Sequence, residues 1–236
     1  MITFLIPTYN EFSNIEIIVN KINSLYLKET YKIHFIDDNS RDGSLEIFEK
    51  LKKNHHNVYY NIRKSSQRDL TQSIIYALQF IDTKYLLIID CDLQHDVNSI
   101  PTMIDWLINK KYDLVIGCRN INKINQLNRR YISFFGILIT KITGIPKLKD
   151  PLSGFFALRT KDFKIVSPYI KSRGYKILLS LIFYLPKDKK IKEIDINFYE
   201  RKFEKSKLNL KIKFLFVSQI IRLTLSKVIK IFTNNN

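Results

Sequence analysis

The chain has 236 residues, of which 45% are hydrophobic and 13% aromatic, and this is enough apolar surface for a packed core. Such a composition excludes a disordered chain, and no apolar run is long enough to predict a membrane-spanning helix. The formal net charge of +17 indicates either an anionic partner (a nucleic acid, a membrane surface or a phosphorylated substrate) or simply a solvated basic surface.

The N-terminal sequence and the number of cysteines indicate in which cellular compartment the protein folds. The first residues, "MITFLIPTYNE", lack the basic start of a signal peptide. Cys91 and Cys118 are too few for a disulfide framework, so we expect free thiols, with Cys118 buried. We therefore expect a cytoplasmic globular protein.

The first half of the sequence alternates strand and helix patterns. Short apolar runs that stop at polar residues predict strands at residues 2–7, 31–38, 58–62, 84–90 and 113–119. Apolar residues at helical spacing predict helices at 10–26, 40–54, 69–81 and 98–110, with Asn10 or Ser13 as possible caps of the first. Strands joined by helical crossovers predict an α/β fold, a mostly parallel sheet with helices on both faces.

The second half is less regular. It begins with an amphipathic apolar segment at 129–146, followed by a short strand after Gly154 and a helix at 174–185. A strand and a basic loop follow at 190–208, and helical periodicity returns at 208–232. The final helix has one apolar face and one polar face, formed by Phe214, Val217, Ile221, Leu225, Val228 and Phe232 and by Ser218, Gln219, Arg222, Ser226 and Lys230. We expect one domain, residues 1–207, with a basic amphipathic tail at 208–236.

Acidic residues end two of the predicted strands. In parallel sheets ligands bind at the carboxyl ends of the strands, where Asp37, Asp38, Asp90, Asp92 and Arg119 would gather. Two carboxylates separated by one residue repel each other unless a cation or solvent lies between them. Hard carboxylate oxygens suit Mg²⁺ or Mn²⁺ carrying a diphosphate. The alternatives are a solvated loop or a pair of helix-capping residues.

Several motifs occur together in a particular order. They are "PTYNE" after the first strand, "IDDNSRDGS" after the second, "DCDLQH" after the fourth, then "DPLSGFF" and "RKFEKSKL". In this order they resemble the family 2 glycosyltransferases with the GT-A fold, and more closely the dolichyl- or polyprenyl-phosphate mannosyltransferases. The resemblance covers about residues 1 to 210. It implies a GT-A catalytic domain at 1–207.

The resemblance also implies site residues. The nucleotide would be bound by Pro7, Tyr9, Glu11, Ile36, Asp38, Asp90, Cys91, Asp92, Arg119, Arg201 and Lys207. Asp92 and Gln94 would hold the metal, Mg²⁺ or Mn²⁺. Arg119, Arg130 and Ser133 would receive the lipid phosphate. Asp90, Asp92, Arg119 and Arg201 would be the catalytic group.

The implied reaction is an inverting, metal-dependent transfer of a hexose to dolichyl or polyprenyl phosphate. GDP-mannose is the favoured donor, and mannose the group that is transferred. A lipid-phosphate oxygen, already ionised, would attack the anomeric carbon, so no general base is required, and positioning and electrostatic stabilisation would supply the catalysis.

The sequence departs from the family pattern in four places. Cys91 replaces a small alanine, "HDVNSIP" replaces H-P-P-E, Glu204 replaces a glycine of the basic loop, and "SSQRDLTQS" lacks a glycine-rich form. We expect Cys91 to pack as a small hydrophobic residue and His95 to form hydrogen bonds without acting in catalysis. One of Asp37 and Asp38 is expected to cap the following turn.

The amphipathic segments at 131–145 and 208–232 have two interpretations. They could pack against the domain, or lie in a membrane interface with nearby lysine and arginine side chains meeting anionic head groups. We favour the second, with peripheral attachment to the cytoplasmic face of a membrane, directly or through a membrane-protein partner.

Other functions stay open. The donor could be UDP-glucose or another nucleotide sugar, and the acceptor a polysaccharide. A basic nucleic-acid-binding protein is a further alternative, although no recognised nucleic-acid motif occurs and acidic strand ends would repel a phosphate backbone, so we expect no nucleic-acid partner. A catalytically inactive scaffold is disfavoured by the intact Asp90, Asp92 and Gln94.

Overall fold

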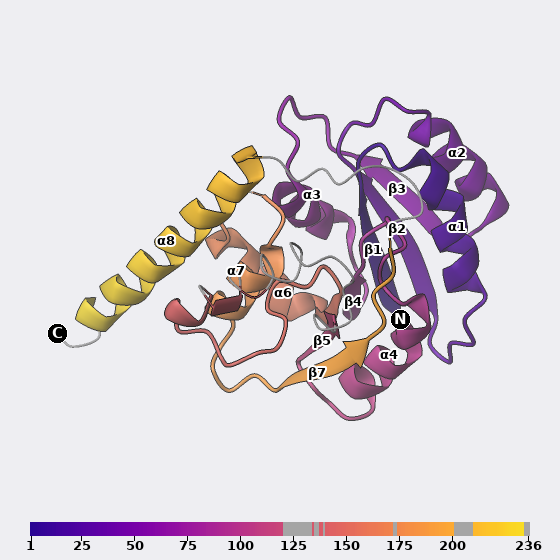
Figure 1. Ribbon diagram of the computed structural model, residues 1–236. Helices are drawn as coiled ribbons and strands as arrows, with labels where there is room; N and C mark the ends of the chain where they lie inside the picture. The colour runs from indigo at the N-terminus through magenta and orange to yellow at the C-terminus, as the bar shows by residue number, and fades with distance from the viewer. Residues whose placement is uncertain (120–133, 135–136, 139, 172–173, 201–209, 234–236) are drawn as a thin grey trace.

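The computed structural model describes residues 1–119, 134, 137–138, 140–171, 174–200 and 210–233, and all structural statements below concern these residues. Figure 1 shows a central sheet with helices packed on both of its faces and a long C-terminal helix at one side.

The sheet of the described chain has the strand order β3-β2-β1-β4-β6-β5-β7. The strands are β1 (Ile2–Thr8), β2 (Tyr31–Asp37), β3 (Val58–Ile62), β4 (Tyr85–Ile88), β5 (Leu114–Arg119), β6 (Phe156–Arg159) and β7 (Ile191–Ile196). All neighbouring pairs are parallel except those of β6, which runs antiparallel to β4 and β5. The predicted mostly parallel α/β sheet is confirmed. Because β6 is reversed, its amino end lies at the same sheet edge as the carboxyl ends of β4 and β5.

Most of the described helices were predicted, but the helix at residues 160–166 was not. The described helices are α1 (Phe12–Asn23), α2 (Ser44–Asn54), α3 (Leu70–Ala77), α4 (Ile100–Ile108), α6 (Thr160–Val166), α7 (Ile177–Tyr184) and α8 (Leu210–Thr233), with 3₁₀ turns η1 (Leu78–Phe80), η2 (Val97–Ser99) and η4 (Ser167–Tyr169). The predicted caps of α1 were wrong, because its N-cap is Glu11, whose own side chain makes no capping hydrogen bond. Asn10 instead has a φ of +50° and accepts a hydrogen bond from the Arg41 N–H.

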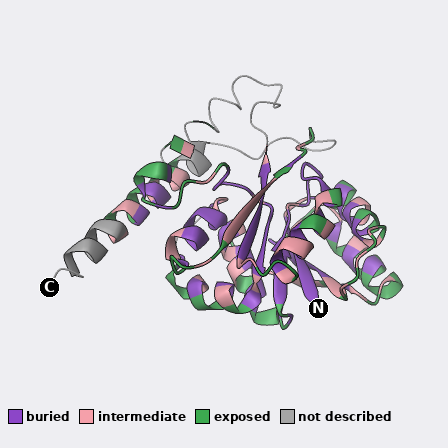
Figure 2. Cartoon of the chain, turned by 90° about the horizontal axis from the view of Figure 1, so that it is seen from below, coloured by how far each residue is buried: buried purple, intermediate pink, exposed green. Residues whose placement is uncertain are grey.

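Two hydrophobic clusters fill the two faces of the sheet (Figure 2). One face packs against α1, α2 and α4 through Ile18, Phe48 and Met103. The other packs against α3, α6 and α7 through residues such as Ile74 and Phe163. Because strands in this sheet are covered on both sides, β1 is buried along its whole length.

Helix α8 packs through a face that its apolar periodicity does not predict. Leu223 is buried against the α7 side of the core. Gln219 is also buried, and its amide donates hydrogen bonds to Lys176 O (2.9 Å) and Ser180 Oγ (2.8 Å). The described side chains of the apolar stripe, Phe214, Val217, Ile221 and Leu225, remain exposed, with Phe214 at 73% and Ile221 at 54%. No described helix is long and apolar enough to cross a membrane.

Candidate active site

The predicted site residues gather at one edge of the sheet. Tyr9 and Glu11 follow β1, Asp38 follows β2, Asp90 follows β4 and Arg119 ends β5. These four strands run in the same direction, since β4 and β5 are each antiparallel to β6 between them. The sheet topology therefore brings the expected donor-binding and phosphate-binding residues to a common edge.

Asp90 contacts two loops, and its side chain is 33% exposed. Its Oδ2 lies 3.4 Å from His95 Nε2, and the ring of His95 packs between Phe155 and Phe198. On its other side lies Gly154, where an added Cβ would be only 2.9 Å from Asp90 Cγ. Glycine at 154 is therefore required by the close approach of this carboxylate. The motifs "DCDLQH" and "DPLSGFF" are in direct contact, and His95 has the hydrogen-bonding role expected of it.

Asp92 and Gln94 lie on a tight turn, and both are buried. The Gln94 N–H donates to Asp92 Oδ1 (3.2 Å), and the Gln94 amide nitrogen donates to Tyr199 O (3.0 Å). That bond fixes which end of the amide is the nitrogen, so its oxygen is the atom that can ligate a metal. Between them Leu93 has a φ of +60°, a left-handed conformation that costs about 1–2 kcal/mol in a non-glycine residue. Such strain is typical of functional turns.

These two residues fit the predicted metal. A carboxylate and an amide oxygen are hard donors, as Mg²⁺ and Mn²⁺ prefer, and such ions usually take further ligands from phosphates and water. Among the described residues there is no group of three or more His, Cys, Asp or Glu side chains placed to hold a metal by themselves.

Arg119 is held by Asp150, the first residue of "DPLSGFF". Its Nε and Nη2 donate to the two carboxylate oxygens at 2.7 and 2.8 Å. Burial alone would disfavour the charged carboxyl, but the Arg119 guanidinium holds the pKa of Asp150 below its usual value. Asp150 is itself positioned by Glu193 on β7, which accepts its N–H at 3.1 Å. The guanidinium is thus fixed beside Asp90, whose charge also stabilises it.

The side of the edge that is expected to bind the nucleotide is built from β1, β2 and the loop before α3. The guanidinium of Arg68 lies 4.4 Å above the ring of Tyr9, and the Glu11 carboxylate accepts from the Asn14 amide (2.7 Å). Asp38 forms an ion pair with Arg63 at 2.5 Å.

Comparisons with known proteins identify the family. The model of glycosyl transferase family 2 matches residues 3–167. The chain belongs to glycosyl transferase family 2. This membership confirms the family resemblance drawn from the motifs.

Curated relatives extend over most of the chain. It is 27% identical to a dolichol-phosphate mannosyltransferase of Mycosarcoma maydis (93% of this chain, 77% of the relative) and 30% identical to that of Saccharomyces cerevisiae (94% and 86%). The enzyme of the same name from Pyrococcus furiosus is 31% identical, and the alignment covers 94% of this chain but 63% of that longer protein.

Solved structures show the fold. Glucosyl-3-phosphoglycerate synthase from Mycobacterium tuberculosis, in complex with Mn²⁺, UDP and glucosyl-3-phosphoglycerate, matches with a TM-score of 0.73 at 16% identity, covering 96% of this chain and 79% of that one. Its complex with Mn²⁺, UDP-glucose and phosphoglyceric acid gives 0.72 at 15%. This likeness confirms the GT-A fold of this family 2 chain.

Not every predicted residue reaches the accessible edge. Ile36 is fully buried in the core beside α3, so here it supports the edge from beneath. Cys91 is buried in the opposite cluster and packs as the small hydrophobic residue expected. Asp37 caps the turn after β2 by accepting from the Ser40 N–H (2.7 Å), and its burial raises its pKa. Arg130, Ser133, Arg201, Glu204 and Lys207 lie outside the described residues.

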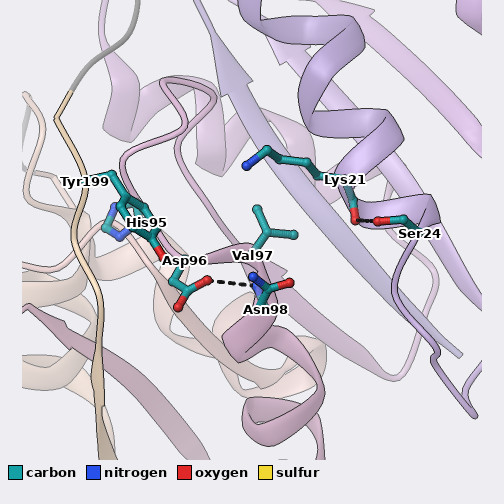
Figure 3. A pocket seen from close by; sticks show the side chains of 7 residues that line it. All are labelled: Lys21, Ser24, His95, Asp96, Val97, Asn98 and Tyr199. Atoms are coloured by element: carbon teal, nitrogen blue, oxygen red, sulfur yellow. Dashed lines mark hydrogen bonds between the residues drawn. The ribbon is translucent and has the colours of Figure 1, made fainter.

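A small cavity of about 100 Å³ lies beside the turn that carries Gln94 (Figure 3). Its lining comprises Lys21, Ser24, His95, Asp96, Val97, Asn98 and Tyr199. Asp96 caps η2 by accepting from the Asn98 N–H at 3.1 Å. Ligand pockets usually measure roughly 300–1,000 Å³, so this cavity is too small for a sugar nucleotide.

Sequence reasoning missed two features of this glycosyltransferase edge. Asp150 was quoted in its motif but not assigned as the partner of Arg119. Lys176 was interpreted only as part of a helix. It stands directly before the apolar run of α7, and a lysine next to buried positions was the signal that could have identified it.

Proposed function

We propose that this chain transfers mannose from GDP-mannose to dolichyl or polyprenyl phosphate, with Mg²⁺ or Mn²⁺ bound. The observation that carries the proposal is the shared sheet edge of Asp90, Asp92, Gln94 and Arg119, in a chain 27–31% identical to three dolichol-phosphate mannosyltransferases over at least 93% of its length. Solved complexes of the fold with Mn²⁺ and UDP-glucose support a metal and a nucleotide-sugar donor.

The chain's own residues suggest how the transfer proceeds. A phosphate oxygen of the acceptor forms a bond to the anomeric carbon while the bond from that carbon to the diphosphate breaks, and the electron pair leaves with the diphosphate. Arg119, fixed by Asp150, places positive charge where phosphates meet. Asp90, in contact with His95 and Gly154, orients the sugar. Asp92 and Gln94 would hold the ion, whose charge when bound offsets that of the departing diphosphate.

A transfer assay tests this function. Purified protein, Mn²⁺ or Mg²⁺ and short-chain polyprenyl phosphate are incubated with radiolabelled GDP-mannose, UDP-glucose and other nucleotide sugars in parallel. We expect label from GDP-mannose in the organic phase, lost with chelator and in Asp92→Asn. Asp82→Asn is the matched control, because Asp82 is exposed and pairs with Lys32 far from the site. Label from another donor, or into phosphoglycerate or a polysaccharide instead of the lipid, would refute the assignment of donor or acceptor.

We also propose that the enzyme works while attached peripherally to the cytoplasmic face of a membrane. Support comes from apolar side chains exposed on α8 and between residues 134 and 142, namely Phe134 (61%), Leu138 (47%), Ile142 (62%), Phe214 (73%), Val217 (50%), Ile221 (54%) and Leu225 (57%). Exposed apolar residues beside basic ones are typical of interfacial helices.

Vesicle flotation tests the attachment. With vesicles of phosphatidylcholine mixed with anionic phosphatidylserine, we expect the protein to float with the lipid. The double variant Phe214→Ser, Ile221→Ser should float less while its melting temperature stays the same, because both side chains are exposed. Equal flotation of this variant would show that the stripe does not bind the membrane.

A further inference from the structure

Lys176 directs its ammonium group at the loop that forms the active-site edge. It lies just before α7, and its Nζ donates to Leu152 O at 3.1 Å. The same loop carries Asp150, which holds Arg119, and Gly154, which contacts Asp90. The amine therefore lies on the segment that shapes the site, although it comes from a different part of the chain.

The backbone around Lys176 is fixed from two other elements. Its carbonyl accepts from the Gln219 amide on α8 (2.9 Å). Two residues earlier, the Gly174 N–H donates to Asp69 (3.0 Å), and Gly174 O accepts from Thr71 Oγ1 (2.8 Å) at the start of α3. The backbone that carries the amine is therefore held in place by α3 and α8.

The charges around the amine favour an anionic ligand. Arg119, Asp150 and Asp90 are the charged groups that act on it. Burial, and next the positive charge of Arg119, lower the pKa of the Lys176 ammonium to about 8, even though the two carboxylates act in the opposite direction. A phosphate beside Nζ would favour the charged form. Leu152 O takes one of the three N–H groups of the ammonium, so the same side chain has the capacity to bind phosphate.

We propose that the Lys176 ammonium binds a phosphate oxygen of the acceptor during transfer. This inference rests on the function proposed above and adds a residue to it. The acceptor is favoured over the donor diphosphate by position, because the expected nucleotide residues follow β1 and β2, on one side of β4, whereas Leu152 precedes β6 on the other side. Lys176 also contacts α8, the helix with the exposed apolar stripe that a lipid chain would approach.

The kinetic test uses Lys176→Met, Lys176→Arg and a matched control. Lys164→Met is the control, because Lys164 also donates from Nζ to a backbone carbonyl, Ile81 O at 2.6 Å, but follows β6 at the opposite sheet edge. We expect Lys176→Met to raise the KM for polyprenyl phosphate about tenfold or more, as for loss of a charged hydrogen bond. The affinity for GDP with Mn²⁺, measured by calorimetry, should be unchanged, and arginine at 176 should restore much of the acceptor affinity.

The opposite pattern would overturn the inference. If the KM for polyprenyl phosphate matches that of the Lys164→Met control, Lys176 binds no acceptor phosphate. If GDP affinity falls instead, the amine binds the donor diphosphate and the acceptor assignment is wrong.

Chemical footprinting of the wild-type protein tests the phosphate-binding role of Lys176 without an activity measurement and without a variant. At pH 8 an amine with a pKa of about 8 is half neutral and is acetylated faster than ordinary lysines, whose pKa is near 10.5. Mass spectrometry of acetylated wild-type protein should show Lys176 protected by polyprenyl phosphate and not by GDP with Mn²⁺. Protection by GDP with Mn²⁺ alone would refute the proposal. The wild-type transfer assay tests the proposed function separately. If polyprenyl phosphate protects Lys176 but the protein transfers no mannose, the proposed function is wrong and the phosphate-binding role of Lys176 stands.

Discussion

Replacing Gly154 by alanine tests whether the loop before β6 sets the position of Asp90. The new Cβ would lie 2.9 Å from Asp90 Cγ and 3.0 Å from its Oδ1, whereas ordinary contacts begin at 3.4 Å. Asp90 Oδ2 would be closer still, so the carboxylate, whose side chain is 33% exposed, would have to move by about 1 Å toward solvent. The φ angle of Gly154 is not positive, so alanine suits its backbone.

The expected effect is mainly catalytic. A misplacement of about 1 Å in a catalytic group can cost about a hundredfold in rate, so we expect kcat to fall about ten- to a hundredfold. The free energy of unfolding should change less, because about 1–3 kcal/mol of overpacking is partly offset by about 0.4–1 kcal/mol from a stiffer unfolded chain. The transfer assay and urea unfolding measure the two quantities separately.

A double-mutant cycle with Asp90→Ala completes this test. If Gly154 acts by leaving space for Asp90, alanine at 154 should have little further effect on the rate once Asp90 is truncated, since the two changes share one contact. Independent, multiplying losses would refute the reasoning, and so would full activity of the single Gly154→Ala variant.

Three further changes test other parts of the structure. Asp150→Asn should lower the free energy of unfolding at pH 7 by about 3–5 kcal/mol, because it leaves Arg119 buried without its ion pair. The pKa of Asp150 is lowered in the folded state, so its contribution to the free energy of unfolding is complete above the ordinary pKa of 3.8 and is lost as the pH falls below that value. The difference in urea midpoint between the variant and the wild type should therefore shrink below pH 3.8. A difference that stays constant would contradict the assignment. Asp92→Asn should weaken the Mn²⁺-dependent part of GDP binding in calorimetry, and an unchanged Mn²⁺ dependence would exclude Asp92 as a ligand. Leu223→Ala should lower the free energy of unfolding by about 2 kcal/mol or more, because Leu223 is buried. Ile221→Ala should lower it by at most about 0.5 kcal/mol, because Ile221 is exposed. The reverse order in thermal melts would show that α8 packs through its apolar stripe.

The regular elements could be predicted because they follow local periodicity. Val58–Ile62 is a strand with the bounds expected, and the other strands and helices that were predicted and are described differ mainly at their ends, whereas α6 was not predicted. The ends depend on hydrogen bonds between distant residues. The Phe12 N–H at the start of α1 donates to Asp42 (2.9 Å), thirty residues away, and no local capping pattern contains that partner.

The candidate site was predictable only as far as its motifs. The topology rule placed Asp90, Asp92 and Arg119 at a common edge, and the structure does so. The contact of Gly154 with Asp90 joins residues far apart in the sequence, and it depends on the antiparallel direction of β6, which the short pattern "FALR" does not encode. The exposure of the apolar stripe on α8 could not be predicted either, since periodicity identifies the two faces of the helix but not the hydrogen bonds that Gln219 makes to the core.

Asp69 links the two sides of the site, and it occurs where the family has a glycine-rich segment. Its N–H donates to Asp38 on the nucleotide side (2.6 Å), while its carboxylate accepts from Gln72 N (3.0 Å), which caps α3, and from Gly174 N (3.0 Å), two residues before Lys176. Because one buried residue makes these bonds, through its backbone N–H and its carboxylate, the loop after β2 and the loop before α7 share an anchor. The departure from the family pattern therefore replaces backbone freedom by side-chain hydrogen bonds, and it positions Lys176 from the donor side of the same edge.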